Sequence, residues 1–249
     1  MSVSRRHAIH WPKSQPNGEN EPTSTIVVSS PNGFFVDVRC TKGETLTPEW
    51  FFSGHEIIDP HDESVIEFNH EFFDSQYVSN CTADIPADIG TFSDPQDEGE
   101  RAAGIRVEKG TMVNPVTGIL EPYVEKWITA DPYSRDLHWI GEDASSGARC
   151  VVLQAGTADK MCNVIPGQHI GRIVSYGSWR QGVFWCRDDH LDEESTVGVI
   201  RAYNDEVIVK HGAYAGTVFP SWENIRNVTQ HGEVLIVGNV KWLVIEYIP

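Results

Sequence analysis

Short segments rich in β-branched and aromatic residues recur along this chain, whereas helical periodicity is nearly absent. Ser24–Ser30 and Gly33–Cys40 are joined by Pro31-Asn32-Gly33, and an Asn-Gly pair favours the positive φ angles of a tight hairpin turn. The pattern predicts an all-β antiparallel fold. The further predicted strands, each bounded by Gly, Pro, Asn or Asp, are Glu49–Ser53, Val65–Phe73, Gln76–Thr82, Ile105–Glu108, Tyr123–Thr129, Cys150–Gln154, His169–Tyr176, Gly182–Arg187, Thr196–Tyr203, Glu206–His211, Glu233–Val237 and Val240–Tyr247.

Two segments with a similar pattern predict that the chain has two similar halves. Gly110–Ile128 and Gly232–Ile248 both run strand, Gly-containing turn, strand, as expected for the closing hairpin of each half. Strands that are apolar on both faces, such as Phe34-Phe35-Val36 and Ile173-Val174, favour closed barrels packed on one another over sandwiches. The expected organisation is a flexible leader over residues 1–22, a first β-barrel over 23–130, a polar connection over 131–147, and a second β-barrel over 148–249. One short helix is expected at Pro220–Asn227, with Ser221 as its cap.

Net charge and cysteine spacing limit the binding partners and the cellular compartment that we expect. The formal charge of −17 repels phosphate backbones, so neither nucleic-acid nor anionic-membrane binding is expected, whereas a protein partner with a basic surface stays open. The first residues lack the apolar stretch that a signal peptide contains, and no apolar run long enough to span a membrane follows. This pattern predicts a cytoplasmic protein. Five scattered cysteines without C-x-x-C spacing are expected to be reduced thiols.

One set of motifs is more specific than the strand pattern. It comprises Glu49–Gly54 (EWFFSG), Val113–Gly118 (VNPVTG), Arg180–Gly182 (RQG), Ser221–Asn224 (SWEN) and Lys241–Tyr247 (KWLVIEY). In this order, these motifs resemble the fungal Hri family, which is named for a yeast protein that interacts with a casein-kinase-I homologue. The resemblance implies a pair of calycin-like, lipocalin-like β-barrels in a fungal cytoplasmic protein with no established biochemical activity.

Neither a metal nor a cofactor is expected. His55, His61 and His70 lack the short spacing that places two ligands on one element. The acidic runs Asp59–Glu63, Asp94–Glu100 and Asp188–Glu194 lack the register and closing Glu of a calcium loop, which favours solvated connections. Nucleotide-binding glycine motifs and a serine-hydrolase elbow are also absent from the sequence.

Aromatic and polar residues alternate on several predicted strands, which points to one lined face. Tyr123, Glu125 and Trp127 share one face of their strand, and Phe35, Asp37 and Arg39 share one face of theirs. Two interpretations stay open: the rings simply fill the barrel, or they wall a small-molecule cavity with a few polar groups. Asp37 and Arg39 pair at the surface, which is the favoured alternative, or meet inside, where burial shifts the Asp pKa.

The leading hypothesis is a barrel that encloses a small apolar metabolite. Its catalytic form is a cofactor-free cyclase, dehydratase or hetero-Diels–Alder-type pericyclase of fungal specialised metabolism, by analogy of architecture alone. The alternatives are a kinase-associated adaptor without catalysis and a passive metabolite carrier. The candidate donors are Asp37, His70, Tyr123 and Gln181, and the candidate ligand-binding residues are Trp50, Trp127, Tyr176, Trp179 and Arg180.

Overall fold

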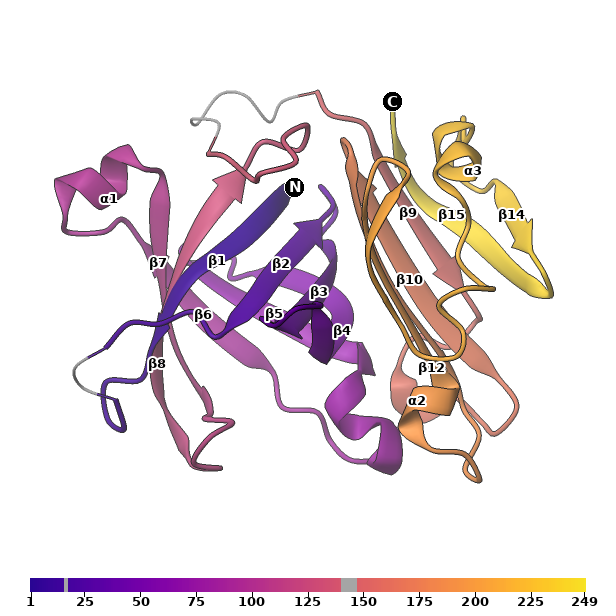
Figure 1. Cartoon of the computed structure of the whole chain (residues 1–249), viewed down its shortest axis with the longest axis horizontal. Coiled ribbons are helices and arrows are strands. Elements are labelled where there is room, and N and C mark those ends of the chain that lie inside the picture. Colours follow the sequence, from indigo (N-terminus) through magenta and orange to yellow (C-terminus); the bar gives the residue numbers. More distant parts are fainter. Residues whose placement is uncertain (16–17, 140–146) are drawn as a thin grey trace.

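A computed structural model describes residues 1–15, 18–139 and 147–249 and shows an almost entirely β protein made of two packed units (Figure 1). The first unit contains β1 (Ser2–His10), β2 (Thr23–Ser29), β3 (Phe34–Thr41), β4 (Thr47–Ile58), β5 (Val65–Asp74), η1 (Ser75–Asn80), β6 (Asp88–Ser93), α1 (Glu98–Ala102), β7 (Ile105–Val113) and β8 (Leu120–Ala130). The second contains β9 (Cys150–Ala155), η2 (Met161–Asn163), β10 (His169–Tyr176), β11 (Trp179–Cys186), α2 (Glu193–Thr196), β12 (Val197–Tyr203), β13 (Glu206–His211), α3 (Trp222–Arg226), β14 (Val234–Val237) and β15 (Val240–Ile248). The predicted all-β class is confirmed.

The first unit is a closed antiparallel barrel in which β1 to β8 follow one another in order. The turn predicted at Pro31-Asn32-Gly33 joins β2 to β3, and Gly33 has a φ of 84°, the left-handed conformation that glycine adopts at little cost. The last strand, β8, pairs with β1 and so closes the barrel. A barrel without free edges leaves no unpaired strand for aggregation.

The flexible leader predicted over residues 1–22 differs from the structure. Ser2–His10 forms β1, which pairs with both β2 and β8, and only residues 16–17 of this range lie outside the described residues. The strand is held because Val3 is fully buried against the second unit, whereas Arg6 points into the barrel and is 5% exposed. The strand was missed because the β1 side chains that point into the barrel, among them Ser4 and Arg6, are polar or charged.

The second unit is a seven-stranded antiparallel sheet with the order β13-β12-β11-β10-β9-β15-β14. Within the described residues, the pairing leaves β13 and β14 at its two ends. The sheet repeats one feature of the barrel, because its last strand, β15, pairs with its first, β9. The two predicted closing hairpins are therefore β7–β8 and β14–β15, and they occupy equivalent places in the two units.

The main core lies between the barrel wall and one face of the sheet. Side chains that point outward from β2 to β5 pack against inward-facing side chains of β9 to β13. Both faces of these strands are covered, as the apolar pattern predicted, because Phe35 faces the barrel interior while Val36 faces the sheet. Buried members of this interface include Ile26, Val28, Val38, Phe51, Phe73, Val152, Val174, Trp179, Val183 and Trp185.

Short helices and loops cover the remaining surfaces. The predicted helix is present as α3, and Ser221 caps it in a capping box with Asn224. The predicted strand Gln76–Thr82 was wrong: Asp74 accepts a hydrogen bond from the Gln76 amide and starts η1 instead. Residues 140–146 of the predicted connection lie outside the described residues. In the described ranges, no helix combines the length and apolar character that crossing a membrane requires.

Candidate functional site in the barrel

The barrel interior is lined by the two faces that the alternation singled out. Phe35, Asp37 and Arg39 of β3, together with Glu125 and Trp127 of β8, surround the same central cavity. Asp37 is 2% exposed and Arg39 is 6% exposed, so the favoured surface pairing of these two residues was wrong. They meet inside because the strand closes into a barrel and their face has no access to solvent.

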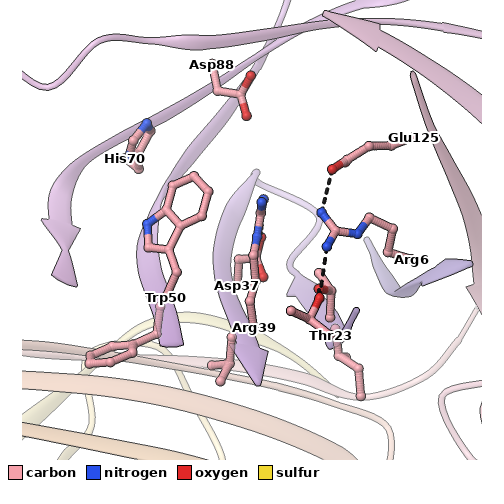
Figure 2. Close-up of polar contacts among 12 residues, drawn as sticks. Arg6, Thr23, Asp37, Arg39, Trp50, His70, Asp88 and Glu125 are labelled. Atoms are coloured by element: carbon pink, nitrogen blue, oxygen red, sulfur yellow. Dashed lines mark hydrogen bonds and ion pairs between the residues drawn. The ribbon is translucent and has the colours of Figure 1, made fainter. Parts of the chain in front are cut away.

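A layer of ion pairs crosses the middle of the barrel (Figure 2). Arg6 Nη1 donates to Glu125 Oε1 at 2.5 Å, and Arg6 Nε donates to Glu21 Oε2 at 2.7 Å. Arg39 donates to Asp37 Oδ2 at 2.9 Å, and its guanidinium lies 4.3 Å from the ring centre of Trp50. Burying a charge is costly, and pairing of this kind offsets the cost.

The ion pairs shift pKa values within the layer. Burial would lower the pKa of Arg6, but Glu125 and Glu21 outweigh it and raise that pKa. Burial raises the pKa of Asp37, although Arg39 opposes the rise. The layer also separates two open ends of the barrel: a pocket of about 250 Å³ at one end and a cavity of about 410 Å³ at the other.

Beside this layer lies a buried acid held by a phenol. The Tyr123 hydroxyl donates to Glu108 Oε1 at 2.7 Å and lies 3.2 Å from Asp88 Oδ1. Burial raises the pKa of Glu108 well above its usual value, and the charges of Glu125 and Asp88 raise it further. One phenolic proton cannot satisfy two carboxylates at once, and the raised pKa favours the neutral form of the Glu108 carboxyl, in which it can donate a hydrogen bond.

The pocket of about 250 Å³ opens over this acid. Its apolar walls include Val27, Phe68 and Trp127, and Glu108 lies at its base. The same four side chains also border a small inner cavity of about 30 Å³, which extends to Asp37. Pockets for small molecules are typically apolar with a few convergent polar groups.

Two buried polar atoms in this region have no partner among the described residues. They are Asp37 Oδ1, an acceptor, and the indole nitrogen of Trp127, a donor. Both side chains line the inner cavity. An unsatisfied buried polar atom costs about 1–3 kcal/mol, so a guest that carries a donor and an acceptor would recover hydrogen bonds that the chain itself does not make.

His70 and Trp50 form a cluster beside the charged layer, which the Trp50 ring contacts through Arg39. His70 Nδ1 is 2.7 Å from Asp74 Oδ2, and the Trp50 indole donates to Asp74 Oδ1 at 2.9 Å. The His70 ring packs 5.1 Å from that of Phe52, and its Nε2 is 3.1 Å from Pro86 O. Both ring nitrogens of His70 are therefore occupied, which favours a positioning role over proton transfer.

The other candidates lie in the second unit, apart from this pocket. Gln181 donates from Nε2 to the carbonyls of Ile26 and Val36, at 2.8 and 2.9 Å, so it fastens the sheet to the barrel. Trp179 and Tyr176 are buried in the interface core. Arg180 points to the opposite face of the sheet, where it lines another cavity. The structure therefore brings Asp37, Tyr123 and Trp127 together and keeps these four residues away from them.

Sequence reasoning missed several charged residues of the interior. Arg6 was assigned to the leader, and Glu108 and Asp88 were not singled out. Glu108 lies on a predicted strand, but its alternation with the apolar Val107 predicts a solvent-facing side chain, so no signal in the sequence indicated its inward direction. Asp88 carried no such signal either, because its strand is short and polar.

Comparison with known proteins supports the resemblance that the motifs indicated. A search of curated proteins gave no match. The crystal structure of an uncharacterized protein, YLR301w from Saccharomyces cerevisiae, is similar in fold, with a TM-score of 0.77 and 18% sequence identity over 100% of this chain and 99% of that one. The model of the family described as Protein HRI1 matches residues 2–246. The chain therefore belongs to the HRI1 family.

Proposed function

We propose that this protein binds a small, neutral and largely apolar molecule in the pocket at the open end of the barrel. The observation that carries the proposal is the pair of unpartnered buried atoms, Asp37 Oδ1 and Trp127 Nε1, that border the inner part of an apolar-walled pocket. A cavity that existed only through loose packing would be lined by apolar atoms alone. Here a donor and an acceptor converge on it.

The chemistry of the pocket defines the kind of guest. A protonated Glu108 and the indole of Trp127 offer hydrogen bonds to a carbonyl oxygen, whereas Asp37 Oδ1 accepts from a hydroxyl group. Val27, Phe68 and Phe92 supply apolar walls. A flat molecule with a ketone or enone at one end and a hydroxyl group at the other matches both requirements.

A catalytic form of the same proposal needs no further group. The Glu108 acid polarises an enone oxygen by donating a hydrogen bond, while the walls hold a flexible chain in a folded geometry, which favours ring closure. No net proton is transferred in such a cyclisation, since the acid donates a hydrogen bond and retains its proton. A carrier would use the same contacts without converting the guest.

The binding proposal is tested with a neutral probe. We expect 4-(hydroxymethyl)acetophenone to bind saturably by isothermal titration calorimetry, and 4-ethylbenzyl alcohol, which lacks the carbonyl, to bind about 3–10-fold more weakly, the equivalent of one neutral hydrogen bond. Ser4→Phe fills the pocket and should abolish binding, because Ser4 lines it. The matched control is Ser93→Phe, on the exposed outside of the barrel.

Two results would overturn the proposal: equal binding to wild type and Ser4→Phe, or tighter binding of 4-ethylbenzylamine than of the ketone, which would require an ionised acid in the pocket. Native mass spectrometry of freshly purified protein then distinguishes a carrier from an enzyme. An unmodified guest indicates a carrier, and conversion of an added precursor indicates an enzyme. An empty barrel together with a salt-sensitive complex would favour the adaptor, for which the net charge of −17 suits a partner with a basic surface.

A further inference from the structure

The second unit holds a cavity that the barrel pocket does not explain. It is an open cavity of about 740 Å³ on the face of the sheet that points away from the barrel. Its floor is formed by Arg180 of β11 and Ile200 of β12. Phe219, Pro220 and Trp222, at the start of α3, form one wall.

Arg180 at this floor is a buried cation with almost no partners. The side chain is 4% exposed, its Nε has no hydrogen-bond partner in the described part of the chain, and its Nη1 lies 3.5 Å from Pro220 O. None of the ion pairs within residues 1–15, 18–139 and 147–249 includes it. Burial lowers the pKa of Arg180, and the charge of Asp205 opposes that shift without contact.

Two other buried arginines of the same sheet, Arg201 and Arg172, make more hydrogen bonds than Arg180 does, although the Nε of Arg172 also has no partner in the described residues. Arg201 donates to Gln181 Oε1 at 2.7 Å and to Ser24 Oγ at 3.1 Å, as well as to backbone carbonyls. Arg172 donates to Gly54 O at 3.0 Å and to Gln154 Oε1 at 2.6 Å. These two arginines therefore fasten the sheet to the barrel or to itself. Arg180 makes no comparable set of bonds, although burying a cation without partners is costly.

The rim of the cavity adds two further cations. Lys210 and Arg226 are exposed, line the cavity and form no ion pair in the described residues. Asp205 and Glu223 also line it, so the cavity carries a net charge of about +1 in a chain of −17. Such a local reversal of sign attracts an anion.

The wall that faces these cations is rigid and partly apolar. The capping box fixes α3, and Ile225 anchors it with no exposed surface. Trp222 is half-buried, and its ring centre lies 5.8 Å from the Arg180 guanidinium. The volume of about 740 Å³ far exceeds that of a bare ion, so the wall has room for a flat organic group beside the anion.

We infer that this cavity is a second ligand site, which binds the oxyanion of a small aromatic carboxylate or phosphate ester. The Arg180 guanidinium donates charge-assisted hydrogen bonds to the oxyanion, and Trp222 packs against the ring of the ligand. Lys210 and Arg226 add long-range attraction at the rim. The site is independent of the barrel, because Arg180 and the interface residue Gln181 point to opposite faces of β11.

Phenyl phosphate, benzoate and inorganic phosphate, titrated at low ionic strength with protein-detected NMR, test the inference. We expect saturable 1:1 binding of at least one aromatic anion, with shifts at the Trp222 indole and Arg180 Nε–H signals, and weaker binding of inorganic phosphate. Benzamide, the neutral analogue of benzoate, should bind at least about tenfold more weakly than benzoate. Whichever of the two aromatic anions binds more tightly identifies the ligand as a phosphate ester or a carboxylate.

Arg180→Met should weaken the binding of the aromatic anion at least about tenfold. Because it removes a buried unpaired charge, it should also leave the thermal midpoint unchanged or raise it. Lys109→Met, which removes an exposed cation from the barrel, is the control for net charge and should bind as wild type does. Ser4→Phe should not alter anion binding, so failure of the barrel proposal is distinguishable. Absence of saturable binding by the wild type, or equal binding by Arg180→Met, overturns the inference.

Discussion

Arg6 and Glu125 are 119 residues apart in the chain and form a buried ion pair across the seam where the first strand of the barrel meets the last. Arg6 is 5% exposed and Glu125 is 2% exposed. The pair therefore links closure of the barrel to the charge balance of its interior. Arg6 also holds Glu21 and Thr23, which ties the chain that follows β1 to the same charged layer.

Removal of Arg6 should destabilise the protein strongly. Arg6→Met leaves Glu125 buried without its partner, which costs about 3–5 kcal/mol of unfolding free energy. The double variant Arg6→Met/Glu125→Leu should recover part of that loss, since the more deeply buried of the two carboxylates that Arg6 binds is then absent, although Glu21 still lacks its partner. Chemical denaturation measures both. Arg135→Met, which breaks the exposed pair with Glu206, should cost less than about 1 kcal/mol, and an equal cost for the two arginines would contradict a structural role of the seam.

Glu108 should make stability fall as pH rises. Its pKa is raised in the folded protein, so the native state holds a proton that the unfolded state releases near pH 4.3. The stabilisation is complete below that pH and is lost as pH rises toward the folded pKa, by up to about 1.4 kcal/mol per pH unit. Glu108→Gln, which mimics the neutral acid, should remove this loss.

The measurement is the denaturation midpoint of wild type and Glu108→Gln at several pH values. The denaturation midpoint of Glu108→Gln should rise relative to that of the wild type as pH increases from about 5 to 8. Glu44→Gln, at an exposed turn, serves as the control, and its denaturation midpoint should depend on pH as that of the wild type does. A difference that shrinks with rising pH would show that Glu108 is ionised in the folded state.

Gln181 should matter for the joint between the two units. Gln181→Leu removes the hydrogen bonds that this side chain makes with the carbonyls of Ile26 and Val36 and with the guanidinium of Arg201. The loss should lower the free energy of unfolding by about 2–4 kcal/mol. Gln76→Leu, at an exposed position of η1, should stay within about 0.5 kcal/mol of wild type. A small cost for Gln181→Leu would mean that water replaces these bonds at no loss, and would assign the joint to apolar packing alone.

The alternation of residues on β3 and β8 made it predictable which side chains share a face, but not that the face of Asp37 and Arg39 points inward, because a surface pair was the favoured alternative for them. A period of two places Asp37 with Phe35, and Glu125 with Trp127, whatever the remaining strands do. The hairpin between β2 and β3 was also readable from Asn32-Gly33, although only Gly33 of this pair takes a positive φ. These are local constraints, and both hold in the structure.

The parts that escaped prediction depend on distant partners. Ser2–His10 is polar because its inward residue Arg6 finds a carboxylate on β8, and a sequence pattern does not reveal that pairing. Gln181 and Arg180 look alike as donors in sequence, but one meets backbone carbonyls of the barrel and the other faces a cavity. Only the packing of one unit on the other decides between them.

The barrel pocket should bind its ketone probe less tightly as pH rises. Glu108 donates to the carbonyl oxygen only while protonated, so affinity for 4-(hydroxymethyl)acetophenone should be constant at low pH and fall through the raised pKa of Glu108. The bound ketone favours the protonated acid, so the affinity begins to fall at the pKa of Glu108 in the free protein and levels off above its higher pKa in the complex. Glu108→Gln keeps an N–H donor, and its affinity should not change with pH. Calorimetric titrations across the pH range measure both proteins, and the probe itself does not ionise. Affinity that rises with pH in the wild type would place an ionised carboxylate at the base of the pocket and exclude the neutral-acid mechanism.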